Sequence, residues 1–222
     1  GASVVSGGIV RYRAYSSRGL SGPDVGVLVA FCSFTFALGC IMLGGMVLLC
    51  VPELAGRFIP DAPIWLSYVA GAGLLLIVYL YVMGSWRQFK PLHFRKFSLE
   101  YPRLRIVAQQ LAVAPLELLG AAGIIYFALP ADSNPGFLMV LGIFLASFSA
   151  ALLSHAPGGL GVLEVMFLMA LPDINPADLI AALLVFRLFY LLIPLAISLV
   201  IVLLFERGQL LARIRADRDR SG

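Results

Sequence analysis

Four long apolar segments limit what this chain can fold into. Each holds the roughly 20 apolar residues that an α-helix needs to cross the hydrocarbon core of a bilayer, and they are Val25–Val51, Ile64–Gly84, Ile106–Leu129 and Leu179–Phe205. The chain of 222 residues is 61% hydrophobic and 13% charged, which leaves too little polar surface to cover a soluble globule. We therefore predict an all-α polytopic membrane protein, with residues 1–222 as a single transmembrane domain.

Basic residues gather in three stretches, residues 11–18, 87–105 and 207–220, and the connections between the other spans carry mostly acids. By the positive-inside rule the basic stretches face the cytoplasm, so both ends of the chain are predicted to be cytoplasmic and the number of crossings must be even. Residues 206–222 are then a cytoplasmic tail or linker. The loop between the second and third spans mixes basic and aromatic residues at the membrane border, which favours contact with lipid headgroups over nucleic-acid binding.

The segment Pro135–Pro172 is long enough for two passes only if the helix breaks near its middle, and Pro157-Gly158-Gly159 provides that break. Phe137–Leu153 and Leu160–Leu171 are then two short passes, or a re-entrant pair that does not cross fully. Either alternative restores an even number of crossings. The expected fold is a helical bundle of about six passes with broken or re-entrant helices at Gly-rich breaks.

Three ionisable residues lie deep inside apolar spans: Glu117, Glu164 and Arg187. Each costs about 2.5–3.5 kcal/mol at the centre of a lipid-facing helix, so all three are expected to face the bundle interior, a partner charge or a wet cavity. Glu164 and Arg187 form either a structural ion pair or part of a substrate pathway. Pro194, one turn beyond Tyr190 in the span of Arg187, is expected to kink that helix.

Glu117 lies in a span that also carries Gln109, Gln110 and Pro115, so this helix is expected to turn polar groups inward. The carboxylate either binds a cationic group or is protonated and hydrogen-bonded to a neighbouring helix. The pair Ser154-His155 does not make a hydrolase site, because neighbouring residues of a helix do not face each other. We expect no catalytic site, no cofactor and no metal, and Cys32, Cys40 and Cys50 are expected to be packing residues.

Four stretches, in the order SGGIVRYRAYSSRGLS, AFCSFTFALG, SHAPGGLGVLE and ALLVFRLFYLLIPL, closely resemble the membrane region of the bacterial phosphatidylglycerol lysyltransferases, the multiple peptide resistance factors. The resemblance runs through nearly the whole chain. It implies a flippase domain of the bacterial cytoplasmic membrane that moves lysyl-phosphatidylglycerol to the outer leaflet, giving resistance to cationic antimicrobial peptides. It also implies a cytosolic synthase domain that makes this lipid from aminoacyl-tRNA.

The chain is accordingly expected to be part of a larger protein, because it begins GASVVSGGIV without a methionine or a signal peptide and has neither the upstream spans nor the synthase domain of that family. The parent protein is then a phosphatidylglycerol lysyltransferase. Expected partners are phospholipid, the membrane and the synthase domain, and a homodimer is compatible with the sequence.

The resemblance carries functional roles to Arg11, Arg13, Glu117, Glu164 and Arg187. Their chemistry fits an aminoacylated lipid, because Glu164 or Glu117 can bind its ammonium group, and Arg187 or the arginines at positions 11 and 13 can bind its phosphate. Backbone amides of Gly158 and Gly159 are further phosphate ligands, and Gln109 is a further polar candidate. Two other functions stay open: a membrane platform that positions the synthase without transport, and an ion-coupled transporter of a soluble solute.

Overall fold

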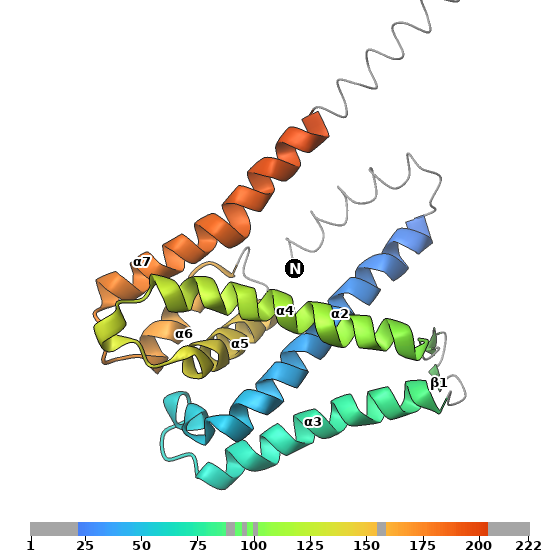
Figure 1. The fold of residues 1–222 in the computed structure, drawn as a ribbon, viewed down its shortest axis with the longest axis horizontal. Coiled ribbons are helices and arrows are strands. Elements are labelled where there is room, and N and C mark those ends of the chain that lie inside the picture. Colours follow the sequence, from blue (N-terminus) through green and yellow to red (C-terminus); the bar gives the residue numbers. More distant parts are fainter. Residues whose placement is uncertain (1–21, 88–91, 95–96, 100–101, 155–158, 204–222) are drawn as a thin grey trace, which may run out of the picture.

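A computed structural model describes residues 22–87, 92–94, 97–99, 102–154 and 159–203 (Figure 1). Four of its helices are long and apolar enough to cross a membrane. They are α2 (Gly22–Cys50), α3 (Ile64–Trp86), α4 (Leu104–Ala128) and the helix that begins as α7 (Pro176–Arg187) and continues to Leu203. The four predicted spans are therefore confirmed, and with them the all-α polytopic class.

Short elements occupy the connections between these helices. The 3-10 helix η1 (Pro52–Arg57) follows α2, and the 3-10 helix η2 (Ala131–Ser133) follows α4. Strands β1 (Leu92–Phe94) and β2 (Phe97–Leu99) form an antiparallel pair between α3 and α4, in which His93 lies opposite Ser98. These three-residue strands do not alter the fold class.

The segment between α4 and α7 folds into two shorter helices, α5 (Phe137–Leu153) and α6 (Val162–Ala170). The 17 residues of α5 extend about 25 Å and the nine of α6 about 13 Å, whereas the hydrocarbon core is about 30 Å thick. Figure 1 shows α5 and α6 side by side against the long helices. Of our two alternatives, two short passes or a re-entrant pair, these lengths fit the re-entrant pair. Four full-length spans with a re-entrant pair also give an even number of crossings.

The helix of α7 departs from regular α-helical geometry immediately after Arg187. Residues Leu188–Leu192 form a π-helical segment, η4, and the α-helix resumes at Ile193. Pro194 has no N–H to donate to the carbonyl of Tyr190, so a regular α-helix would lack one hydrogen bond here. The irregularity lies where the sequence predicted a kink, and it takes the form of a wider turn.

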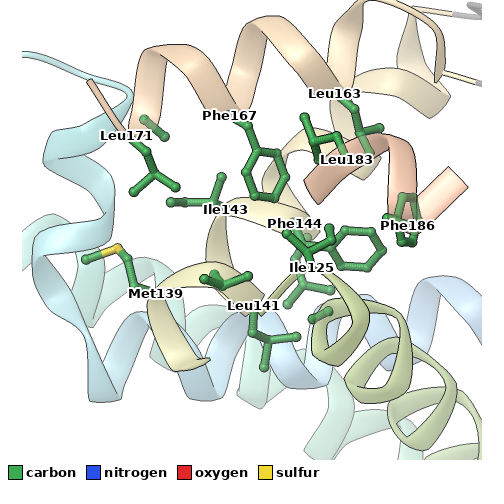
Figure 2. Close-up of a cluster of buried hydrophobic side chains, with 14 of the residues drawn as sticks. Ile125, Met139, Leu141, Ile143, Phe144, Leu163, Phe167, Leu171, Leu183 and Phe186 are labelled. Carbon is green, nitrogen blue, oxygen red and sulfur yellow. The ribbon is translucent and has the colours of Figure 1, made fainter. Parts of the chain in front are cut away.

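The re-entrant pair provides the centre of the core. Nine of the 17 residues of α5 are buried, although α5 is shorter than any of the four spans. In Figure 2, Phe144 of α5 lies among Phe186 of α7 and Ile125 of α4, and Phe167 of α6 and Leu183 of α7 extend the cluster. Since lipid is as apolar as these side chains, close packing rather than water exclusion stabilises such a core.

Small residues allow α2 to lie close to two neighbours. A Cβ atom added to Gly39 would be 2.7 Å from the Cβ of Ala114 in α4. A Cβ atom added to Gly71 of α3 would be 2.9 Å from the carbonyl oxygen of Gly45 in α2. Membrane helices commonly pack through small residues in this way.

Candidate functional site

The tip of the re-entrant pair is shaped by two glycines in left-handed conformations. Gly159 has φ +65° and Gly161 has φ +82°, which residues with a Cβ rarely adopt. Gly161 is the N-cap of α6, and α6 begins at Val162. The predicted Gly-rich break therefore lies between α5 and α6, although Pro157 and Gly158 themselves are outside the described residues.

Glu164 uses both of its carboxylate oxygens at this tip. Its Oε2 accepts a hydrogen bond from the backbone N–H of Gly161 at 2.9 Å, as an acid at the third position of a helix commonly does. Its Oε1 accepts from Arg187 twice, from Nε at 3.0 Å and from Nη2 at 2.6 Å. A negative charge in the first turn of α6 is also stabilised by the dipole of that helix.

Arg187 joins α7 to this tip. Its side chain is 11% exposed and that of Glu164 is 24% exposed, so the pair is largely withdrawn from the surface. Nη2 also donates to the carbonyl oxygen of Gly159 at 3.4 Å. The structure thus shows that Glu164 and Arg187 form an ion pair with each other.

The contact between these residues also places the tip beside the last candidate span. Arg187 is the last of the 12 residues of α7, about 16 Å along the axis from the start of that helix. That is about half the thickness of the hydrocarbon core. Because Glu164 and Gly159 reach Arg187 there, the turn between α5 and α6 lies near the middle of the spans.

A second carboxylate, that of Glu117, lies nearby and is more exposed than that of Glu164. Glu117 of α4 is exposed on the surface of the described residues, and its Oε1 accepts a hydrogen bond from the hydroxyl of Tyr190 at 3.0 Å. Tyr190 is three residues after Arg187, on the same side of the last helix. We call Glu117, Glu164, Arg187 and Tyr190 the intramembrane polar cluster.

Packing of aromatic rings holds Tyr190 in place. Its ring stacks on that of Phe186, with centroids 5.1 Å apart and an angle of 17° between the planes. Phe186 is buried and contacts Phe144 of α5 at 5.5 Å. The tyrosine that donates to Glu117 is therefore attached to the same core as the re-entrant pair.

The inward-facing glutamine of α4 is Gln110. Gln109 is exposed, whereas Gln110 is 3% exposed. The amide of Gln110 donates to the hydroxyl of Thr35 at 2.8 Å, and its Oε1 accepts from the hydroxyl of Tyr81 at 2.8 Å. These bonds join α2, α3 and α4, so Gln110 connects helices, whereas Gln109 lies on the exposed surface.

The polar contacts of two residues, Tyr190 and Arg57, were not predicted from the sequence. Tyr190 lies on the helical face of Arg187, which was the available signal, but its partner on α4 could not be read from spacing. Arg57 of η1 donates to the carbonyl oxygen of Ala170 at the end of α6, at 3.3 Å. It also pairs with the exposed Asp173 at 3.5 Å, and no pattern in the sequence links these distant positions.

Three predicted site residues lie outside the described residues: Arg11, Arg13 and Gly158. Gly159 is described, and its carbonyl oxygen accepts a hydrogen bond from Arg187, whereas we predicted that its amide binds phosphate. Among the described residues no group of three His, Cys, Asp or Glu side chains could hold a metal ion.

Comparison with known proteins shows what kind of protein this is. The inner membrane protein YbhN of Escherichia coli is 31% identical over 205 residues, which are 90% of this chain and 63% of YbhN. The chain is a multi-pass membrane protein. An uncharacterised protein of Synechocystis, slr0712, is 29% identical over 223 residues, which cover 100% of this chain and 68% of that protein.

A shorter match connects the chain with lipid metabolism. The phosphatidylglycerol lysyltransferase of Staphylococcus haemolyticus is 32% identical over 92 residues, which are 40% of this chain and 11% of the enzyme. This match covers less than the nearly complete resemblance that the sequence motifs suggested. No protein-family model matches the chain. Together these similarities support a role related to membrane lipids.

Proposed function

We propose that this chain moves an aminoacylated phosphatidylglycerol, such as lysyl-phosphatidylglycerol, from the inner to the outer leaflet of a bacterial cytoplasmic membrane. The observation that carries the proposal is the exposure of the Glu117 carboxylate near the middle of α4. This carboxylate is about 20 Å along α4 from Leu104, near mid-span, and it remains exposed while it accepts a hydrogen bond from Tyr190. An exposed carboxylate at that depth costs several kcal/mol in lipid, so a cation or water is expected to approach it.

The ammonium group of an aminoacyl headgroup has the charge that Glu117 requires. A hydrogen bond from Tyr190 orients the carboxylate, and an ammonium group can donate to the oxygen that Tyr190 leaves open. Glu164 is a poorer candidate for the same role, because both of its oxygens are already engaged. We therefore assign cation binding to Glu117 rather than to Glu164.

The phosphate of the lipid requires a cation along the same path. Arg187 is one turn from Tyr190, and it can bind phosphate if it exchanges part of its contact with Glu164. Arg11 and Arg13 are the other proposed phosphate ligands. Acyl chains remain in the bilayer while the headgroup passes along these charges, and the resulting cationic outer surface would repel cationic antimicrobial peptides.

The wider arrangement is part of the proposal. The chain spans about two thirds of the two relatives that it matches throughout, with 68% of one and 63% of the other, and the whole protein's partners are inferred from them and from the lysyltransferases. Both ends are proposed to be cytoplasmic because the basic stretches flank the spans on one side. A cytosolic synthase domain would then supply the lipid on that side.

A second candidate is a membrane platform that positions a synthase without transport. The closed ion pair between Glu164 and Arg187 favours it, because a pair that only fixes helix packing needs no exchange with substrate. Under this alternative Glu117 would have no cationic ligand.

Leaflet exchange of lysyl-phosphatidylglycerol in proteoliposomes that contain the full-length protein tests the proposal. We expect Glu117→Gln to slow exchange at least tenfold, because it removes the negative charge. Tyr190→Phe should slow exchange several-fold, because it removes the hydrogen bond that orients the carboxylate. Asp132→Asn, which changes an acid in η2, is the matched control and should exchange at the wild-type rate. Exchange by the wild type equal to that of empty liposomes would reject translocation, and unaltered exchange by Glu117→Gln would reject the assignment of this residue.

A further inference from the structure

A recess separate from the intramembrane polar cluster lies between α2, α3, α5 and η1. Its volume is about 290 Å³. Small residues on three elements leave this space open: Gly44 on α2, Ala55 on η1, and Gly142 and Ala146 on α5. No charged residue lines the recess, and none of the four residues of the polar cluster does.

The recess opens toward the lipid. Gly44, Leu48, Leu74 and Ala146 are only partly buried, so the wall that they form is not sealed by protein. A stably bound water needs two to four polar partners, and the one hydroxyl on the wall is that of Ser149. Water is therefore a poor occupant, and an apolar group from the bilayer is a good one.

The recess is elongated along α2. Its wall includes Cys40 and Leu48, which are eight residues apart and hence separated by about 12 Å along the helix. Leu54 and Phe58 of the connection after α2 also line it, so the recess extends to that connection. An extended hydrocarbon chain lying parallel to the helix axis fits this shape.

Charges of both signs lie at the η1 end. Glu53 and Asp61 are exposed, and Arg57 is partly exposed and paired with Asp173, whose side chain is itself 85% exposed. An ion pair with so exposed an acid contributes little to stability. A headgroup with both a phosphate and an ammonium group matches this mixture better than a purely anionic headgroup.

We propose that the recess binds one acyl chain of a phospholipid, with the headgroup beside η1, among Glu53, Arg57 and Asp61. This inference rests on the proposed function in so far as the bound lipid is the one that is moved: with the basic stretches cytoplasmic, the η1 end faces the outer leaflet, where a translocated lipid would arrive. The recess itself does not depend on transport.

Photocrosslinking tests the recess directly. The probe is lysyl-phosphatidylglycerol with a diazirine midway along one acyl chain, incorporated with the full-length protein into liposomes, and crosslinks are mapped by peptide mass spectrometry. We expect them on the segments of α2 and α5 that line the recess. Gly44→Leu and, separately, Ala146→Leu should lower their yield at least fivefold by filling the space.

Gly73→Leu is the matched control, because Gly73 is on the exposed surface of α3 with no atom near its added Cβ. It should leave the yield unchanged, and thermal unfolding of each variant shows whether the protein is folded. Crosslinks spread evenly over all exposed spans and unaltered in both filling variants would mean surrounding bilayer lipid only, and would overturn the proposal.

The same samples separate this inference from the proposed function. Crosslinks in the recess without leaflet exchange by the wild type would retain the lipid site and reject translocation. Leaflet exchange with evenly spread crosslinks would retain translocation and reject the recess. If Gly44→Leu lowers both the crosslinks and the exchange rate, the bound lipid lies on the path of the moved lipid.

Discussion

At the scale of single residues, Glu164 combines two tasks that usually fall to different side chains. One oxygen accepts from the first turn of α6 and the other accepts from Arg187. The carboxylate thus satisfies a backbone N–H at a helix start and neutralises a cation near mid-membrane with one group. Substitution of Glu164 would remove its hydrogen bond with the N–H of Gly161 and its ion pair with the guanidinium of Arg187.

A double-mutant cycle on the ion pair follows from this arrangement. Glu164→Ala or Arg187→Ala alone should lower the free energy of unfolding by about 2–3 kcal/mol, since each leaves one charge without its partner. The double variant with Ala at both positions should lose less than the sum of the two single losses. Unfolding in detergent micelles measures all four proteins, and additive losses would contradict an energetic coupling between the two residues.

Sequence reasoning located the unusual residues but not their states. The cost of a charge in lipid singled out Glu117, Glu164 and Arg187 as residues in need of partners. Glu164 and Arg187 pair with each other, whereas Glu117, which we expected to face inward, is exposed and accepts a hydrogen bond from Tyr190. Which carboxylate pairs with the arginine depends on the turn at Gly159 and Gly161. Hydropathy does not predict the geometry of such a turn. The choice between Gln109 and Gln110 likewise needed the helix rotation, which two adjacent glutamines do not reveal.

At the scale of elements, the bounds of the long helices could be predicted and the role of the short ones could not. The predicted helix Phe137–Leu153 agrees with α5 at both ends, because Gly136 and the Gly-rich break leave little choice. That the shortest apolar helices would form the centre of the core was not predictable from length. Apolar composition alone does not distinguish a face that contacts lipid from a face that contacts protein.

Close helix packing makes Gly39 sensitive to substitution. Gly39→Ala should lower the free energy of unfolding by about 1–3 kcal/mol, because the new methyl group would collide with Ala114 of α4. Gly26→Ala in the same helix is the matched control, since nothing lies within 4 Å of its added Cβ, and it should leave stability unchanged or slightly higher. Equal effects of the two substitutions would argue against the α2–α4 contact.

At the scale of the whole molecule, the re-entrant pair reconciles the basic stretches with the number of spans. If all four long helices cross, the chain returns to the side on which it started, and we propose that α5 and α6 enter and leave from one side. The sequence predicted the even number of crossings but allowed either six passes or four with a re-entrant pair. The contact of Glu164 with Arg187, near the middle of the candidate span Pro176–Leu203, favours the re-entrant pair.

Cysteine labelling tests this topology. In a variant without Cys32, Cys40 and Cys50, single cysteines at Ser133 and Asp173 should react with a membrane-impermeant maleimide from the same face of the membrane. Arg87→Cys should react from the opposite face. Leu160→Cys, at the tip, should react from that opposite face at least tenfold more slowly than Arg87→Cys, and an equal rate would mean that α5 crosses the membrane completely.

The π-helical segment Leu188–Leu192 affects how this helix would tolerate an insertion or deletion. A π-helical turn contains one residue more than an α-helical turn, and each residue of an α-helix contributes about 100° of rotation. The part of the helix after Leu192 is therefore out of phase with the part that carries Arg187. Loss or gain of a single residue in this segment would rotate the helix after Leu192 about its axis and so change which of its residues face the lipid. The contact of Arg187 with Glu164 would not change. An insertion or deletion would therefore be tolerated in this segment.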